Sequence, residues 1–119
     1  MATGETKAFF MSDPIDLEHL NLYTVGDNGL LDEILSLFIE QVESLSNRLC
    51  EIPDSETWRE ASHKLKGASR GVGAWALGDL AETAEQAAAG NDAERKAIAE
   101  EIAQAAREAI EFAVRTRNQ

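Results

Sequence analysis

The sequence predicts an all-α fold: an up-down-up-down antiparallel four-helix bundle with a short N-terminal accessory helix. Three observations lead to this prediction. Alanine, leucine and glutamate dominate the 119 residues, and these residue types favour helix. Apolar residues recur at steps of three and four over long stretches, which is the period of an amphipathic helix. Breaks rich in glycine, proline and asparagine divide the chain into segments that can fold back on one another.

Capping and breaking residues set the expected helix boundaries. Ser12 or Asp13 before Pro14 indicates the start of the accessory helix, because a capping side chain is followed by proline in the first turn. Asp54 or Ser55 can cap a later helix in the same way. Helices are expected over about 14–22, 28–52, 74–89 and 93–115, with a further one between the cap at 54 or 55 and the glycines at 71 and 73.

Length and charge limit the classes of function. Residues 1–119 are expected to form one domain, with residues 1–11 flexible. The 22 acidic and 11 basic residues give a formal net charge of -11, which argues against nucleic acid as a partner because phosphate binding needs a basic face. The apolar run 8–11 is too short for a signal peptide or a membrane span, so a cytoplasmic location is expected. A monomer is expected because no apolar stripe is left over.

Two further side chains are assigned to the interior. Cys50 is the only cysteine, so the chain cannot form an internal disulfide, and its neighbours Leu49 and Ile52 predict a buried thiol without a catalytic role. Trp75 shares the expected inner face of helix 74–89 with Leu77. Its position just after Gly73-Ala74 leaves two uses open, packing under the preceding helix or facing a partner.

The stretch 61–74 carries the strongest functional pattern. At about 100° per residue, His63 falls about 160° from Leu65 and points to water. Lys66 and Gly67 are the i+3 and i+4 neighbours that touch the imidazole. Glycine inside a helix costs about 1 kcal/mol relative to alanine, so Gly67 indicates room for a large partner. The predicted inner stripe of this helix consists of Trp58, Ala61, Ser62, Leu65, Ala68, Ser69 and Val72.

Positive charge is concentrated in the same stretch. Arg59, Lys64, Lys66 and Arg70 are four of the 11 basic residues, and Glu60 is the only acidic residue between the first and the last of them. One interpretation is a basic patch on an acidic body that meets an acidic partner surface. The other is a solvated face whose positive charges only balance the acidic surroundings.

The residues that carry a family resemblance are His63-x-x-Lys66-Gly67, Gly73-Ala74 and Leu77-x-x-Leu80. This pattern resembles the histidine phosphotransfer (HPt) domains of multistep bacterial phosphorelays, and the resemblance covers the helices from about residue 26 to the C-terminus. It implies the bundle fold and a carrier function. His63 would accept a phosphoryl group from a receiver-domain aspartyl phosphate, or from a kinase, and pass it to a response-regulator aspartate.

The resemblance also implies roles for the neighbours of His63. In the family, a glutamine or glutamate on the following helix often orients the histidine, and the matching position here is Glu85, or Gln86 if the register differs by one. Lys66 is placed for a charge-assisted contact to the phosphoryl group. Gly67 would leave space for the incoming domain.

The implied partners are receiver domains of response regulators and of hybrid histidine kinases, with Arg59, Lys64 and Arg70 at the contact. Mg²⁺ would come with the receiver domain, and the chain itself is expected to hold no cofactor and no metal. It is expected to be a carrier rather than an enzyme, without a kinase or ATP-binding domain.

Two other classes of function, a di-iron protein and a helical adaptor, are compatible with parts of the sequence. Glu60-x-x-His63 and Asp16-x-x-His19 have the spacing of ligands in di-iron bundles, but such pairs must face the bundle interior. The first pair faces outward on the expected helix, and the second lies on the accessory helix, where His19 is expected at the surface. The remaining class is a helical adaptor that binds partners without phosphate, against which the His63, Lys66 and Gly67 pattern argues.

Overall fold

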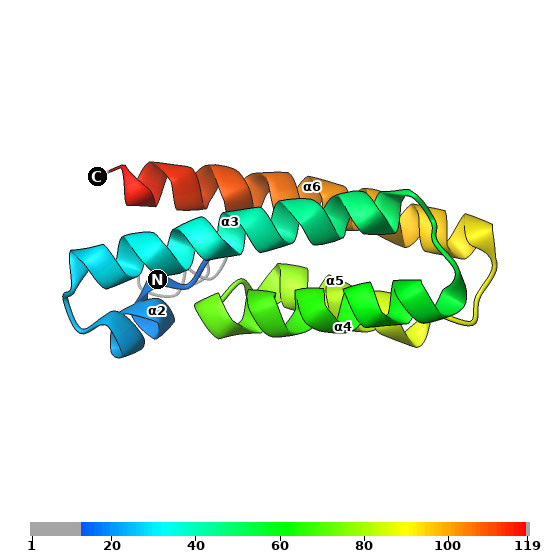
Figure 1. Ribbon diagram of the computed structural model, residues 1–119, viewed down its shortest axis with the longest axis horizontal. Coiled ribbons are helices and arrows are strands. Elements are labelled where there is room, and N and C mark those ends of the chain that lie inside the picture. Colours follow the sequence, from blue (N-terminus) through cyan, green and yellow to red (C-terminus); the bar gives the residue numbers. More distant parts are fainter. Residues whose placement is uncertain (1–12, 119) are drawn as a thin grey trace, which may run out of the picture.

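The computed structural model describes residues 13–118, and all regular secondary structure in this range is helical (Figure 1). The all-α prediction is therefore confirmed for this part of the chain, whereas residues 1–11, expected to be flexible, lie outside it. None of these helices combines the length and the apolar character that crossing a membrane requires. The helices are α2 (Leu17–Thr24), α3 (Asn28–Cys50), α4 (Ser55–Val72), α5 (Trp75–Gln86) and α6 (Asp92–Arg117).

Aspartate and asparagine side chains cap four helices by accepting a backbone N–H of the first turn, an interaction worth about 1 kcal/mol each. Helix α2 begins after Asp16, whose Oδ1 accepts from His19 N at 3.1 Å, so the predicted start at Pro14 with Asp13 as a cap is wrong, and Ser12 lies outside the described residues. The capping residues are Asp16 for α2, Asp27 for α3, Asp54 for α4 and Asn91 for α6.

The four longer helices enclose one apolar core. Helix α3 packs against α4 and α6, and α5 also packs against α4 and α6. Figure 1 shows α3 beside α6 and α4 beside α5, with α2 near the start of α3. The largest fully buried apolar side chains are Ile15, Leu20, Leu35, Phe38, Leu49, Trp58, Leu65 and Ile102.

The inner stripe predicted for α4 is confirmed, except that Ala68 is only half-buried. Trp58 fills the core and also holds α4 to α5, because its indole Nε1 donates to the Ala84 carbonyl at 2.6 Å. Near the same end, the Ser55 hydroxyl donates to the Ala88 carbonyl. These contacts set how α4 is turned, and they leave its opposite side to solvent.

Gly73 makes the turn between α4 and α5. Its φ of 84° is left-handed, and its N–H donates to the Arg70 carbonyl at 3.2 Å, which closes the helix. The chain before α2 crosses this turn closely, since a Cβ at Gly73 would lie 3.0 Å from the Asp16 carbonyl oxygen. Asp16 N also donates to the Gly73 carbonyl at 2.9 Å. The helix runs through Gly71, so Gly73 alone ends it.

Trp75 does not lie on the inner face of α5, and that prediction is wrong. The residue is 44% exposed, its Nε1 donates to Asp16 Oδ2 at 3.1 Å, and its ring meets His19 edge-on with centroids 4.9 Å apart. The reason is position, because the first residue of α5 lies beside α2 instead of the interior of the bundle. His19, expected at the surface, is half-buried by this contact.

The prediction of a buried Cys50 thiol is also wrong, because the residue is exposed. Leu49 takes the core position and is fully buried. Consecutive helical residues differ by about 100°, so Cys50 is turned to the edge of α3, where its Sγ lies 3.9 Å from the Ala99 carbonyl oxygen of α6.

Candidate functional site

Helix α4 presents His63 to solvent near its middle, and 68% of the side chain is exposed. Leu65, two residues further on, is fully buried. Their separation of about 200° around the helix is why burial of one leaves the other outside. The imidazole therefore lies on the outer side of α4, where the sequence predicts it.

Glu85 of α5 holds one nitrogen of this imidazole. Its Oε2 lies 2.9 Å from His63 Nδ1. An ionised carboxylate only accepts hydrogen bonds, so Nδ1 carries the proton of the neutral ring and Nε2 carries the lone pair. Nε2 has no hydrogen-bond partner among residues 13–118. Of the two residues considered for this contact, the structure brings Glu85 to the ring, whereas Gln86 is exposed next to it.

The same carboxylate also binds Lys66, whose Nζ lies 2.7 Å from Oε1 of Glu85. Glu85 thus bridges the imidazole and the ammonium. The Lys66 hydrogen bond is the largest influence on the pKa of Glu85 and lowers it, the His63 hydrogen bond adds to this, and burial opposes both. Lys66 keeps only 22% of its side chain exposed, so it is less open to solvent than the helical wheel indicates.

The space next to the imidazole is open at Gly67. A Cβ placed on this residue would meet no atom within 4 Å, and the residue is exposed. Helix α4 therefore has a low, uncrowded surface one turn from His63. This agrees with the room that the sequence predicts beside the ring.

Arg70 lies further along α4 and reaches across α5. Its Nη2 lies 2.7 Å from Glu82 Oε1 and 3.5 Å from Asp79 Oδ1. The hydrogen bond that Arg70 donates to Glu82 is the main reason that the pKa of Arg70 is raised. Two acidic residues of α5 therefore already surround this guanidinium.

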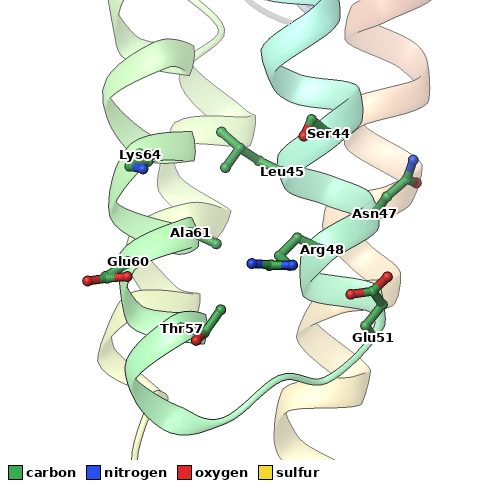
Figure 2. A pocket seen from close by; sticks show the side chains of 9 residues that line it. All are labelled: Ser44, Leu45, Asn47, Arg48, Glu51, Thr57, Glu60, Ala61 and Lys64. Atoms are coloured by element: carbon green, nitrogen blue, oxygen red, sulfur yellow. The ribbon is translucent and has the colours of Figure 1, made fainter.

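The basic residues of α4 do not form one patch. Lys66 and Arg70 face carboxylates of α5, as described above. Lys64 lines a groove of about 510 Å³ between α3 and α4, and Figure 2 shows it across from Leu45 of α3. Arg59 is exposed and makes no ion pair with any residue the structure describes. A count of charges along residues 59–70 alone overstates the positive charge of this face.

The metal-binding alternative gains no support. Within residues 13–118 no three histidine, cysteine, aspartate or glutamate side chains gather as a metal site would require. Glu60 lines the α3–α4 groove, whereas His63 reaches α5 on the other side of α4. Asp16 is used as the cap of α2 and as the acceptor for Trp75.

Two site contacts escaped the sequence reasoning, the Lys66–Glu85 ion pair and the binding of Arg70 by Glu82. The spacing of these four residues in the sequence could have predicted both ion pairs. Lys66 and Arg70 are i and i+4 on α4, and Glu82 and Glu85 are i and i+3 on α5, so each pair occupies one face of its helix. Two facing rows of opposite charge on consecutive helices indicate ion pairs across the contact.

Comparison with known proteins places this site in a family. The family model of the Hpt domain matches residues 33–115, which contain all of α4 and α5. Hpt domains carry out phosphotransfer in two-component phosphorelays, interact there with receiver domains, and are phosphocarriers rather than kinases. Neither the curated proteins nor the solved structures gave a match. Because the family model covers more than half of the chain and includes the whole of the site around His63, this protein belongs to the Hpt domain family.

Proposed function

We propose that this Hpt domain is a phosphorelay intermediate whose phosphorylated residue is His63. It accepts a phosphoryl group from a receiver-domain aspartyl phosphate, or from a kinase, and passes it to a response-regulator aspartate. The observation that supports this best is the unequal environment of the two ring nitrogens. Glu85 binds Nδ1, and the exposed Nε2 keeps its lone pair for attack.

The accepting step is a displacement at phosphorus. The Nε2 lone pair forms the P–N bond while the P–O bond to the aspartyl carboxylate breaks, and the carboxylate leaves with that electron pair. Nδ1 keeps its proton, so positive charge develops on the ring, and the Glu85 carboxylate stabilises it. Transfer to a second aspartate is the reverse process. In-line approach of two domains is the main requirement, and the open surface at Gly67 supports it.

The partner would supply the remaining charge stabilisation. Mg²⁺ is proposed to arrive with the receiver domain, and the chain itself to use no cofactor and no metal. A phosphoryl group brings about two negative charges next to Lys66, which can then share its donors between Glu85 and the phosphoryl oxygens. Arg59, Lys64 and Arg70 are proposed to contact the receiver. Of the three, Arg59 is four residues before His63 on α4 and makes no ion pair with any described residue.

The wider proposal concerns the form in which the protein acts. We propose that it acts as a cytoplasmic monomer that binds no nucleic acid and carries the phosphoryl group without kinase activity of its own. Its four longer helices follow an antiparallel up-down-up-down course, which the short connections 51–54, 73–74 and 87–91 support.

The test is phosphate transfer from a phosphorylated receiver domain to wild type, to His63→Gln and to His19→Gln. The chain has only two histidines, so His19→Gln is the matched control. We expect acid-labile, base-stable label on wild type and on His19→Gln, and none on His63→Gln. Label that persists on His63→Gln would move the site elsewhere. No label on wild type over a panel of receivers and kinases would instead favour an adaptor.

A further inference from the structure

Helix α5 brings Glu85 to the active imidazole, but it has few large side chains to fix its own rotation. Its buried residues are Leu77, Gly78, Ala81 and Ala84. Its N-terminal cap, Ala74, makes no side-chain hydrogen bond. Small side chains interdigitate less than large ones and define a helix rotation weakly. The hydrogen bond from Trp75 to Asp16 holds the first residue of α5, and a further contact from α4 holds the turn that follows.

Arg70 makes that contact. The buried Gly78 of α5 lies directly under its side chain, since a Cβ at Gly78 would be 2.9 Å from Arg70 Cγ and 3.4 Å from Nε. A glycine in mid-helix costs about 1 kcal/mol relative to alanine, and here the space it leaves is filled by the arginine stem. The stem thus crosses α5 at Gly78.

The guanidinium is then held beyond the crossing. Glu82 binds Nη2 at 2.7 Å, and Asp79 lies 3.5 Å from the same nitrogen. Exposed ion pairs contribute little to overall stability, about 0–1 kcal/mol. Here the ion pairs matter for orientation. The aliphatic part of Arg70 packs on Gly78 and its guanidinium binds Glu82, and together these two contacts favour one rotation of α5 about its axis.

Glu82 and Glu85 are neighbours on one face of α5, three residues apart. Across from them, Arg70 is four residues from Lys66 on α4. A rotation of α5 that withdraws Glu82 from Arg70 also withdraws Glu85 from His63. Arg70 itself touches neither the imidazole nor Glu85, so its influence passes through the helix.

We propose that Arg70 is a positioning residue for the phosphohistidine site. By crossing Gly78 and binding Glu82 and Asp79, it fixes the rotation of α5, keeps Glu85 on Nδ1 of His63, and so selects the tautomer with its lone pair on Nε2. The functional consequence rests on the proposed role of His63. The tautomer itself can be measured without any phosphate transfer.

The experiment reads the ¹⁵N shifts of the two ring nitrogens of His63 at about pH 8.5, where imidazole is neutral. In wild type we expect the tautomer with the proton on Nδ1. Arg70→Gln should give a mixture of both tautomers and a several-fold slower transfer, and Arg70→Lys should restore most of both. Arg107→Gln is the matched control, because Arg107 is an exposed arginine of α6 whose only side-chain hydrogen bond within residues 13–118 is to Gln104.

Glu82→Ala provides an independent route, because it leaves Arg70 in place and removes its closest acceptor. It should change the tautomer ratio in the same direction, and this variant also serves if Arg70→Gln does not fold. Unchanged ring-nitrogen shifts in the folded variants would overturn the positioning role. If the shifts change while wild type takes up no phosphate, the positioning role stands and the proposed function fails.

Discussion

At the scale of single residues, the Glu85 carboxylate connects the groups of the site. One oxygen accepts from His63 Nδ1 and the other from Lys66 Nζ. The carboxylate therefore sets the tautomer of the imidazole and holds the nearest ammonium at once. A neutral amide at this position could accept from Nδ1 but would leave Lys66 without a charged partner.

The first prediction is a pH-dependent stabilisation by Glu85. Its pKa in the folded protein lies below the ordinary value of 4.5, chiefly through the Lys66 hydrogen bond. A lowered folded pKa means that the stabilisation is complete above 4.5 and is lost as the pH falls through the folded pKa. Glu85→Gln should therefore reduce the free energy of unfolding at neutral pH, and the difference from wild type should shrink in acid.

Urea unfolding of both proteins at neutral pH and at about pH 3 measures this difference. Glu101→Gln, an exposed change on α6, controls for the loss of one negative charge. An equal difference at both pH values would contradict the prediction.

The second prediction concerns Gly67. Gly67→Leu should slow or abolish transfer because the side chain would occupy the open space one turn from His63. Stability should stay equal or rise by up to about 1 kcal/mol, because leucine favours helix over glycine. Gly71→Leu is the control, since Gly71 is equally open but lies eight residues, about 12 Å, along α4 from His63. Equal transfer rates for the two variants would mean that the partner approaches elsewhere.

At the scale of the element, α4 separates a core face from the solvent-exposed face that carries His63. Trp58 and Leu65 are fully buried, and His63 is exposed between them. The helix can hold a histidine in solvent without strain because its position is set by burial on the opposite side. Helix α5 differs, since its placement depends on polar contacts from Trp58, Lys66 and Arg70.

The third prediction tests the core face of α4. Leu65→Ala should lower the free energy of unfolding by about 2–5 kcal/mol, because it leaves a cavity at a fully buried position. Leu37→Ala on α3 is the matched control, as Leu37 is 61% exposed and its loss should have little effect. Thermal unfolding of both variants gives the comparison. A wild-type melting temperature for Leu65→Ala would contradict the assigned rotation of α4.

At the scale of the whole molecule, α2 and the four longer helices share one core. Ile15 and Leu20 at the N-terminal side are buried in the same cluster as Leu49, Trp58 and the α6 residues. Asp16 adds polar contacts to the α4–α5 turn and to Trp75. The described part of the chain should therefore unfold as one unit.

The fourth prediction is a single unfolding transition. The chain has two tryptophans, so Trp75→Phe leaves the buried Trp58 as the only indole that reports on the core. In this variant, Trp58 fluorescence and far-UV circular dichroism should give coincident urea transitions. Two separated transitions would show that part of the helical structure melts before the core.

Features that depend on one helix at a time could be predicted from the amino-acid sequence. Caps and breaks located the helices to within a few residues, and the three- and four-residue period placed Leu65 inside and His63 outside. These features follow from the fixed rise and rotation of a helix, which relate neighbouring residues without knowledge of any other segment. The same local spacing carried the resemblance to the Hpt domain family.

The side chains of other helices that contact α4 could be identified only in the folded structure. It brought Glu85 to both His63 and Lys66, and it placed Arg70 over Gly78. It also exposed Cys50 and Trp75, whose apolar character predicts burial. The physical reason is that contacts between helices depend on their relative rotation and offset, which the packing of all helices sets together and which no pattern within one helix records.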